Sequence, residues 1–249
     1  MDRWIGKLAI VTGASSGIGE AICKSLVRSG VNVLGLARRE DRLESLKKEL
    51  SGCKGLFYFA KCDVQNEADI VNAFDYAEKK LGGVDILINN AGILKAAPFQ
   101  ETKIEDLRAV MDVNLIAAVT CIREALKSLR KSKKEGHIFN INSIAGLDAK
   151  IASIPINIYP ASKFAMRAMA DSLKMEIKQN KDKIRLTTIY PGLVNTEIIE
   201  LSGLDTEAIF NLMPALVSED IANGVMYALG APPHVQVDDL VITAVHNKE

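Results

Sequence analysis

The sequence has no excess of charge of either sign and no long apolar run. Its 31 Lys and Arg residues balance 31 Asp and Glu residues, so the formal net charge is zero. Proteins that bind nucleic acids or anionic membranes usually carry a basic excess. No apolar run approaches the roughly 20 residues of a membrane-spanning helix. Both absences argue against a nucleic-acid partner and integral membrane association, but a local basic site for a small anion remains possible.

Disulfide and metal-ligand patterns are also missing. The four cysteines have unrelated spacings and form no Cys-x-x-Cys pair: Cys23, Cys53, Cys62 and Cys121. They are typical of reduced thiols in an intracellular protein. The three histidines lie too far apart for a metal-ligand motif: His137, His234 and His246. The chain runs from Met1 into a strand-like segment without the apolar stretch of a signal peptide. We therefore expect a cytoplasmic protein that uses no metal.

Short apolar runs alternate with stretches of helical periodicity along the whole sequence. The predicted strands are Leu8–Thr12, Val31–Leu36, Leu56–Ala60, Asp85–Ile88, Ile138–Asn142, Arg185–Tyr190 and Leu240–Thr243. The predicted helices lie near residues 17–29, 40–50, 66–81, 102–131, 159–180 and 218–229. The strands lack polar alternation, which is typical of strands covered on both faces.

This alternation predicts an α/β fold: a single-domain Rossmann fold over residues 1–249, with a doubly wound parallel sheet of about seven strands and helices on both faces. No linker, low-complexity tract or internal repeat suggests a second domain. Ligands of such sheets bind beyond the carboxyl ends of the strands. Residues that directly follow strands are therefore the candidates for a functional site.

A glycine-rich turn follows the first predicted strand and opens a helix. It consists of Gly13, Ser15, Ser16, Gly17, Ile18 and Gly19, with Ala14 between the first two. Glycines let the backbone bend tightly and let a pyrophosphate approach the free N–H groups of a helix N-terminus. A simple strand-to-helix turn also uses glycine, but the position after the first strand favours a nucleotide site.

The end of the second strand bears on the choice of nucleotide. Folds that bind NAD place an acid there, about 20 residues beyond the glycines, to accept hydrogen bonds from the ribose. Here Ala37 is followed by Arg38 and Arg39. Guanidinium groups bind phosphate through paired hydrogen bonds, so this turn favours the 2′-phosphate of NADP(H). The alternative is a solvated arginine pair at a helix start.

Three further residues form a candidate catalytic group. Ser143 follows the fifth strand, and Tyr159 and Lys163 share one helical face because they are four residues apart. Pro160 is typical of a first helical turn, so Tyr159 should begin the helix. A nearby ammonium would lower the pKa of the phenol toward the working range, and the Ser143 hydroxyl could hold a substrate oxygen beside it.

Together these motifs resemble the short-chain dehydrogenase/reductase family over essentially the whole chain. The resemblance is carried by residues 12–19, Asn89-Asn90-Ala91-Gly92, Asn114, Ser143, Tyr159 with Lys163, and Pro191-Gly192. It implies that Tyr159 is the general acid/base and that Lys163 lowers its pKa and binds the nicotinamide ribose. It also implies that Ser143 orients the substrate oxygen and that Asn114 anchors a water in a proton relay.

The same resemblance implies further cofactor contacts. Asp63 and Val64 would flank the adenine, and Asn90, Ala91 and Gly92 would lie behind the cofactor. The segment 191–196 would contact the nicotinamide through Pro191, Gly192, Val194 and Thr196, the last two near its carboxamide. The arginine turn is similar to the NADP-preferring branch. The interval between Ser143 and Tyr159 is longer than is common in the family.

The substrate pocket should be walled by residues 144–158 and by a lid around residues 194–217. The second stretch is rich in apolar residues: Ile198, Ile199, Leu201, Leu204, Ile209, Phe210, Leu212 and Met213. The alternative is the core packing of a connecting helix. Lys150 is the one cation in either stretch, which favours a lipophilic substrate. Residues 1–4 and 231–237 are similar to a subgroup that includes insect farnesol dehydrogenases and a vertebrate keto-steroid reductase.

The sequence thus predicts an NADP(H)-dependent oxidoreductase that interconverts a lipophilic alcohol, isoprenoid or steroid-like, and its carbonyl. The alternatives are an NADPH-dependent carbonyl reductase of broad specificity and a non-catalytic NADP-binding regulatory protein. A sugar-nucleotide epimerase is disfavoured because few residues follow Gly192. Two helices have apolar residues to spare, which indicates a homodimer or homotetramer unless these residues only cover the sheet: Leu126, Leu129, Met166, Met169, Leu173 and Ile177.

Overall fold

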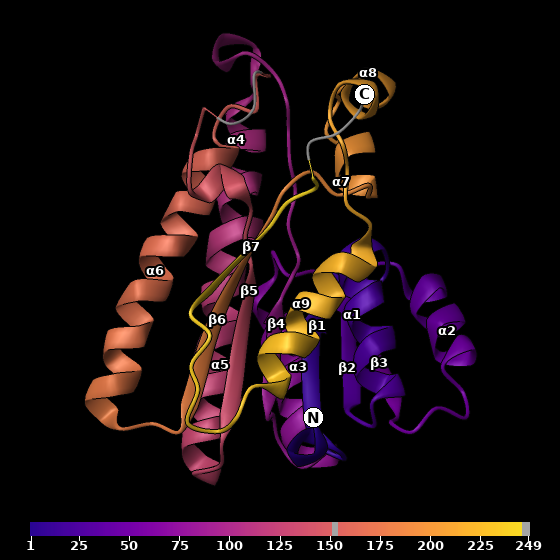
Figure 1. Ribbon diagram of the computed structural model, residues 1–249, viewed down its shortest axis with the longest axis vertical. Helices are drawn as coiled ribbons and strands as arrows, with labels where there is room; N and C mark the ends of the chain where they lie inside the picture. Colours follow the sequence, from indigo (N-terminus) through magenta and orange to yellow (C-terminus); the bar gives the residue numbers. More distant parts are fainter. Residues whose placement is uncertain (151–153, 246–249) are drawn as a thin grey trace.

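Seven parallel strands form one sheet in the computed structural model, which describes residues 1–150 and 154–245 (Figure 1). The strand order is β3-β2-β1-β4-β5-β6-β7. The strands are β1 Leu8–Thr12, β2 Asn32–Ala37, β3 Phe57–Lys61, β4 Ile86–Asn89, β5 Gly136–Ile141, β6 Ile184–Pro191 and β7 Asp239–Ile242. The order in which strands are added changes side at β1: β2 and β3 extend the sheet on one side, and β4 to β7 extend it on the other. The predicted doubly wound parallel sheet is confirmed.

Helices cover both faces of this sheet because successive side chains of a strand point to opposite faces. Ala9 and Val11 pack with α1, α2 and α9, whereas Leu8 and Ile10 pack with α3, α5 and α6. The helices are α1 Gly17–Arg28, α2 Glu40–Glu49, α3 Glu67–Lys80, α4 Ile104–Met111, α5 Ala117–Ser132, α6 Tyr159–Asn180, α7 Glu197–Glu200, α8 Thr206–Leu212 and α9 Ser218–Gly230. None of the helices in the described ranges is long and apolar enough to cross a membrane.

Two expectations about the elements need correction. The predicted helix over 102–131 is divided, because the π-helical segment Asp112–Ile116 separates α4 from α5. Such segments often occur at functional sites, and this one contains Asn114. The strands are also not all covered on both faces. The edge strands β3 and β7 are partly exposed, since each has a neighbouring strand on one side alone.

The apolar residues that suggested an oligomer interface are used inside the chain. Leu126, Leu129, Met166, Leu173 and Ile177 are all buried, and Met169 packs against the same core cluster. They cover the sheet, as the alternative held, so these six residues do not themselves form a contact surface for a second copy. The described surface of α6 instead exposes Phe164 and Met175.

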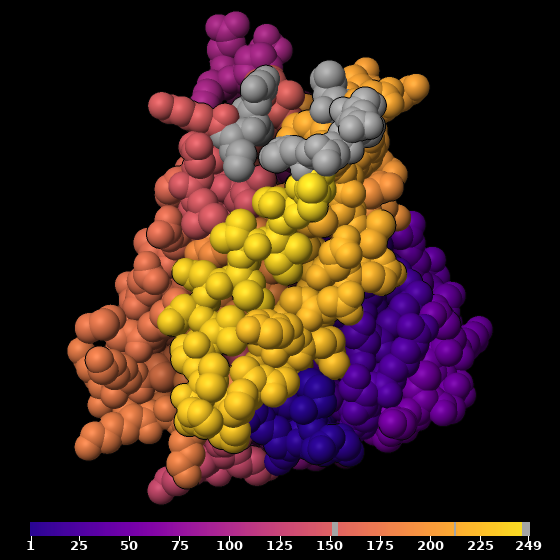
Figure 2. All heavy atoms as spheres, viewed as in Figure 1, coloured from indigo at the N-terminus to yellow at the C-terminus, as the bar shows by residue number. Residues whose placement is uncertain are grey.

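The chain rises beyond the carboxyl ends of the strands in two places. Figure 1 shows α4 and the connections beside it on one side, and α7 with α8 on the other. Figure 2 shows the C-terminal part of the chain, in yellow, lying across the front of the molecule below these two projections. The functional site lies between them, where the predicted sheet places it.

Candidate active site

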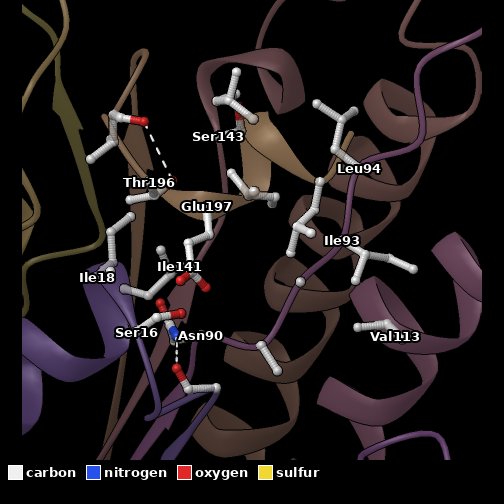
Figure 3. A pocket seen from close by; sticks show the side chains of 18 of the residues that line it. Ser16, Ile18, Asn90, Ile93, Leu94, Val113, Ile141, Ser143, Thr196 and Glu197 are labelled. Atoms are coloured by element: carbon white, nitrogen blue, oxygen red, sulfur yellow. Dashed lines mark hydrogen bonds between the residues drawn. The ribbon is translucent and has the colours of Figure 1, made fainter. Parts of the chain in front are cut away.

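A cavity of about 700 Å³ lies at the carboxyl ends of the strands. It brings together all but two of the residues that the sequence predicts for the site. Those lining it are Gly13, Ser15, Ser16, Gly17, Ile18, Arg38, Arg39, Asp63, Val64, Asn90, Ala91, Gly92, Ser143, Tyr159, Lys163, Pro191, Gly192, Val194 and Thr196. Gly19 and Asn114 lie behind its walls. Figure 3 shows several of these side chains converging from different elements.

The glycine turn is shaped so that its backbone borders the cavity. Gly13 and Gly17 have φ values of +67° and +55°, a conformation that L side chains rarely adopt. A Cβ on Gly13 would lie 2.9 Å from Asn90 Nδ2, and one on Gly19 would lie 2.2 Å from the Gly13 carbonyl oxygen. Gly19 therefore acts outside the cavity, by allowing α1 to pack against the turn. The N-terminus of α1 is left facing the cavity, as an anion site requires.

Thr12 and Asn90 join this turn to the end of β4. The Thr12 hydroxyl oxygen accepts hydrogen bonds from the N–H groups of Asn90 and Ala91, both at 3.0 Å. The Asn90 side chain donates to the Thr12 carbonyl oxygen at 2.9 Å. These bonds connect the carboxyl ends of β1 and β4, so the two neighbouring strand ends are held together at the base of the cavity.

Ser143, Tyr159 and Lys163 meet on the opposite wall. Tyr159 begins α6, and Pro160 occupies the first turn as predicted. The hydroxyls of Tyr159 and Ser143 are hydrogen-bonded. The Lys163 ammonium donates to the Ile141 carbonyl oxygen at 3.2 Å and lies 5.6 Å from the centre of the Tyr159 ring. A phenol, a hydroxyl and an amine thus share a buried corner of the cavity.

Burial shifts the pKa values of the tyrosine and the lysine in opposite directions. It raises the pKa of Tyr159 to about 12, and the hydrogen bond from Ser143 opposes this only in part. Burial also lowers the pKa of Lys163 to about 8. Desolvation disfavours the charged form of each group. The pKa of Tyr159 is therefore raised rather than lowered in the protein by itself, and desolvation is the main cause.

Asn114 supports the site from the π-helical segment. Its carboxamide oxygen accepts from the Ile93 N–H at 2.8 Å, and its amide donates to the Ile93 carbonyl oxygen at 3.0 Å and to the Ser162 hydroxyl at 3.1 Å. These bonds tie the chain after β4 to α6 beside Lys163. A Cβ on Gly92 would lie 3.4 Å from Asn114 Oδ1 and 3.9 Å from Lys163 Nζ, so the two side chains approach the same backbone position.

The two arginines after β2 differ in their surroundings. Arg38 is exposed at the cavity. Arg39 donates to the hydroxyls of Ser15 and Ser16 and forms an ion pair with Glu197 at 2.7 Å. The sequence predicted that both guanidinium groups face a phosphate. It did not predict that the Glu197 carboxylate pairs with one of them, Arg39. Figure 3 shows the Glu197 side chain directed toward Ser16 of the glycine turn.

The other end of the cavity is apolar. Of the stretch rich in apolar residues, six side chains line it: Ile198, Ile199, Leu201, Leu204, Ile209 and Met213. Ile144, Ile154 and Ile156 form part of the wall between β5 and α6. Residues 151–153 of that wall and the side chain of Leu212 lie outside the described residues. Lys150 does not line the cavity, but Lys95 does, a cation that the sequence argument did not consider.

Metal ligands do not gather within the described ranges, where no group of three or more His, Cys, Asp or Glu side chains could hold an ion. His137 is buried against Thr187, and burial keeps its pKa well below the usual value. His246 lies outside the described residues. The four cysteines are free thiols.

Residues 7–205 match the family described as short chain dehydrogenase. The chain belongs to this family. It is 45% identical to a farnesol dehydrogenase of Aedes aegypti over 252 residues, which covers 100% of both chains. It is 40% identical to a protein of Gallus gallus named dehydrogenase/reductase SDR family member 11, over 96% of both chains. The resemblance seen in the sequence motifs is confirmed.

Solved structures of short-chain dehydrogenases share the fold. A closed form of serine dehydrogenase complexed with NADP+ has a TM-score of 0.84 and 29% identity, covering 97% of this chain and 98% of that one. An alcohol dehydrogenase of Thermococcus sibiricus complexed with 5-hydroxy-NADP has a TM-score of 0.84 and 25% identity, covering 98% of both chains. The chain is therefore an oxidoreductase of this family, and it has the fold with which the family binds a nicotinamide cofactor.

Several residues of the site were missed by the sequence argument. Ile93, Leu94 and Val113 line the cavity from the chain after β4 and from the π-helical segment, and nothing in their spacing marks them. Glu197 was assigned to the substrate side only. Its position next to Thr196, a predicted cofactor contact, could have placed it at the cofactor end of the cavity. Its ion pair with Arg39, which is 158 positions away in the sequence, could not be predicted from local pattern.

Proposed function

We propose that this short-chain dehydrogenase uses NADP(H) to interconvert a lipophilic alcohol, such as an isoprenoid or a steroid-like compound, and its aldehyde or ketone. The observation that carries the proposal is the composition of one cavity. One end has the glycine turn and arginines, the corner near Tyr159 has three polar groups suited to proton transfer, and the other end is apolar.

The cofactor fits the residues at the first end. Gly13, Gly17 and Gly92 line the cavity there without a side chain, and α1 presents its N-terminus to it. Arg38 and Arg39 supply the cationic groups for a 2′-phosphate. Asp63 and Val64 would flank the adenine, and Val194 and Thr196 would contact the nicotinamide. When bound, the nicotinamide supplies or accepts the hydride at the substrate carbon.

The chain's own residues handle the proton. The Tyr159 phenol is neutral at physiological pH because its pKa is about 12, so it is ready to donate a proton to a carbonyl oxygen that becomes an alcohol. Ser143, which is hydrogen-bonded to Tyr159, would hold that oxygen beside the phenol. Lys163 lies below the ring and would carry the charge that stabilises the phenolate left behind.

The apolar end selects the substrate. Residues 194–217 would act as a lid, because the side chains of α7 and α8 line the cavity rather than filling the sheet's core. A cavity of about 700 Å³ lies in the range of sites that bury a medium-sized organic ligand. The name of the Aedes aegypti relative, farnesol dehydrogenase, supports an isoprenoid alcohol.

A panel of alcohols tests this function. Purified protein is assayed with NADP+ and NAD+ against isoprenoid, steroid and short aliphatic alcohols, and kcat/KM is compared. We expect the highest values for isoprenoid or steroid alcohols with NADP+. Turnover limited to small polar alcohols would contradict the substrate class, and equal or better values with NAD+ would contradict the cofactor.

A carbonyl reductase of broad specificity is the second candidate. The size of the cavity and the neutral phenol favour reduction of varied carbonyl compounds. The panel therefore includes the matching aldehydes and ketones with NADPH. Similar kcat/KM values for chemically unrelated carbonyls would favour this second function.

A further inference from the structure

Glu197 connects the proposed lid to the cofactor end of the cavity. It is the first residue of α7, and its carboxylate contacts Arg39, which directly precedes α2, and Arg42 of α2. Arg39 Nη1 lies 2.7 Å from Oε2, and Arg42 Nη1 lies 2.5 Å from Oε1. Ser16 of the glycine turn is a further hydrogen-bond partner. One carboxylate therefore bridges the β2–α2 connection and the turn that borders the cofactor.

Each of the three nitrogens of the Arg39 guanidinium donates to at least one partner. Its Nε and Nη2 groups donate to the Ser15 hydroxyl, Nη2 also donates to Ser16, and Nη1 donates to Glu197. A phosphate on the ribose could bind the Nη1 side only by replacing the carboxylate, because two anions on one guanidinium repel each other. Arg38 is exposed beside it at the same wall of the cavity.

The ion pairs are open to replacement. The side chains of Arg39, Arg42 and Glu197 remain 39%, 42% and 31% exposed, and partly exposed pairs contribute little stability. A phosphate carries more charge than a carboxylate and offers more acceptor oxygens. The carboxylate can therefore hold the arginines in the free protein and still give way to the cofactor.

We infer that Glu197 is a specificity-determining residue that competes with the 2′-phosphate of the cofactor for Arg39. The inference rests on the proposed use of NADP(H). The competition lowers the advantage of NADP(H) over NAD(H), since the second cofactor has no phosphate that must displace the carboxylate. Glu197 thus limits the cofactor preference that Arg38 and Arg39 create.

The same contact connects cofactor binding with the substrate wall. Ile198 and Ile199 follow Glu197 in the four-residue helix α7 and line the cavity. When the phosphate displaces the carboxylate from Arg39, α7 loses its contact with the β2–α2 connection and keeps the pair between Glu197 and Arg42, so the wall is held less tightly and can adjust to a substrate. A cofactor without the phosphate leaves this attachment intact.

Glu197→Gln tests the competition, with Glu200→Gln as the matched control. Glu200 is the exposed acid at the other end of the same helix, so its replacement removes the same charge without touching Arg39. The dissociation constants of NADPH and NADH are measured by fluorescence titration for both variants and the original protein. We expect Glu197→Gln to raise the preference for NADPH by about threefold to tenfold, and Glu200→Gln to leave it unchanged.

The outcomes separate the inference from the function on which it rests. An unchanged or lowered preference in Glu197→Gln, in a protein that itself prefers NADPH, overturns the competition alone. No preference for NADPH in either the original protein or the variant contradicts the proposed cofactor as well. Equal changes in Glu197→Gln and Glu200→Gln would show a general charge effect and would also overturn the inference.

Hydrogen exchange gives a second, independent measurement. Adenosine 2′,5′-bisphosphate and adenosine 5′-monophosphate are added separately, and the amides of residues 197–204 are followed. We expect the first compound to speed exchange in this segment and the second to leave it unchanged, with no difference between the two in Glu197→Gln. If the amides of residues 197–204 in the original protein exchanged at the same rate with either compound, displacement of the Glu197 carboxylate by the 2′-phosphate would be contradicted.

Discussion

Tyr159 is the residue on which the proposed proton transfer depends. Replacing it with phenylalanine removes the hydroxyl assigned to proton transfer and leaves the ring in place. We expect kcat to fall about 100- to 10,000-fold, while NADPH still binds, because the glycine turn and arginines are untouched. The assay compares turnover with fluorescence titration of NADPH.

Tyr190 provides the matched control for this change. It is a buried phenol on β6 that does not line the cavity. Tyr190→Phe should retain turnover. If Tyr159→Phe retained normal kcat, the assigned proton donor would be wrong.

Lys163 carries a charge that the fold has to desolvate. Burial lowers its pKa from 10.5 to about 8, so the unfolded chain holds the proton more tightly than the folded one. The resulting cost to stability is complete below pH 8 and disappears as the pH rises from 8 toward 10.5. Lys163→Met removes this cost but loses the hydrogen bond to Ile141. We expect the free energy of unfolding at pH 7 to rise by about 2 kcal/mol, with loss of turnover.

Urea unfolding over a pH series measures this effect. The difference between Lys163→Met and the original protein should shrink between pH 8 and 10.5, because the original protein gains stability there. The contribution of Tyr159 is common to both proteins and cancels. A difference that stays constant over this range would show that Lys163 is not desolvated in the folded protein.

At the scale of elements, the packing of α1 against the glycine turn depends on one missing side chain. A Cβ on Gly19 would lie 2.2 Å from the carbonyl oxygen of Gly13, and backbone cannot move aside as a flexible side chain does. We expect Gly19→Ala to lower the free energy of unfolding by about 1–3 kcal/mol and to weaken NADPH binding. Thermal unfolding and cofactor titration check both effects.

Gly230 is the control for this substitution. It ends α9, and no atom lies within 4 Å of the position that a Cβ would take. Gly230→Ala should leave stability unchanged or raise it slightly, since alanine restricts the unfolded chain. Equal losses in both variants would argue against the specific contact at Gly19.

Strands were the best-predicted elements, and long-range ion pairs the worst. Each of the seven predicted strands starts and ends within two residues of the observed strand, because apolar runs mark strands by local pattern. No sequence signal marks the π-helical segment that divides α4 from α5, since the apolar periodicity continues through it. The pair between Arg39 and Glu197 depends on how two distant connections meet above the sheet. Local sequence cannot contain that information.

At the scale of the whole molecule, one face of α6 remains available to a second copy of the chain. Phe164, Ala168 and Met175 are exposed and lie on the same side of the helix. We expect a homodimer or homotetramer, and Met175→Glu should weaken its association by placing a charge on this face. Light scattering after size exclusion gives the molecular mass at several concentrations.

Tyr227 offers a control on another surface. It is 67% exposed on α9, and Tyr227→Ser should leave the measured mass unchanged. A monomer at every concentration would contradict the expected assembly. An oligomer unaffected by Met175→Glu would move the interface away from α6.

Trp4 has a consequence for the order in which the newly made chain can fold. Its indole N–H donates to the carbonyl oxygen of Leu229 at 2.9 Å, and Arg3 donates to the same oxygen and to that of Ala231. During synthesis residue 4 is made 225 residues before residue 229. The indole of this buried tryptophan therefore has no partner at Leu229 until α9 has been made. A stalled or shortened product that lacks α9 would expose it, and chaperones and proteases could recognise such an unfinished chain by that signal.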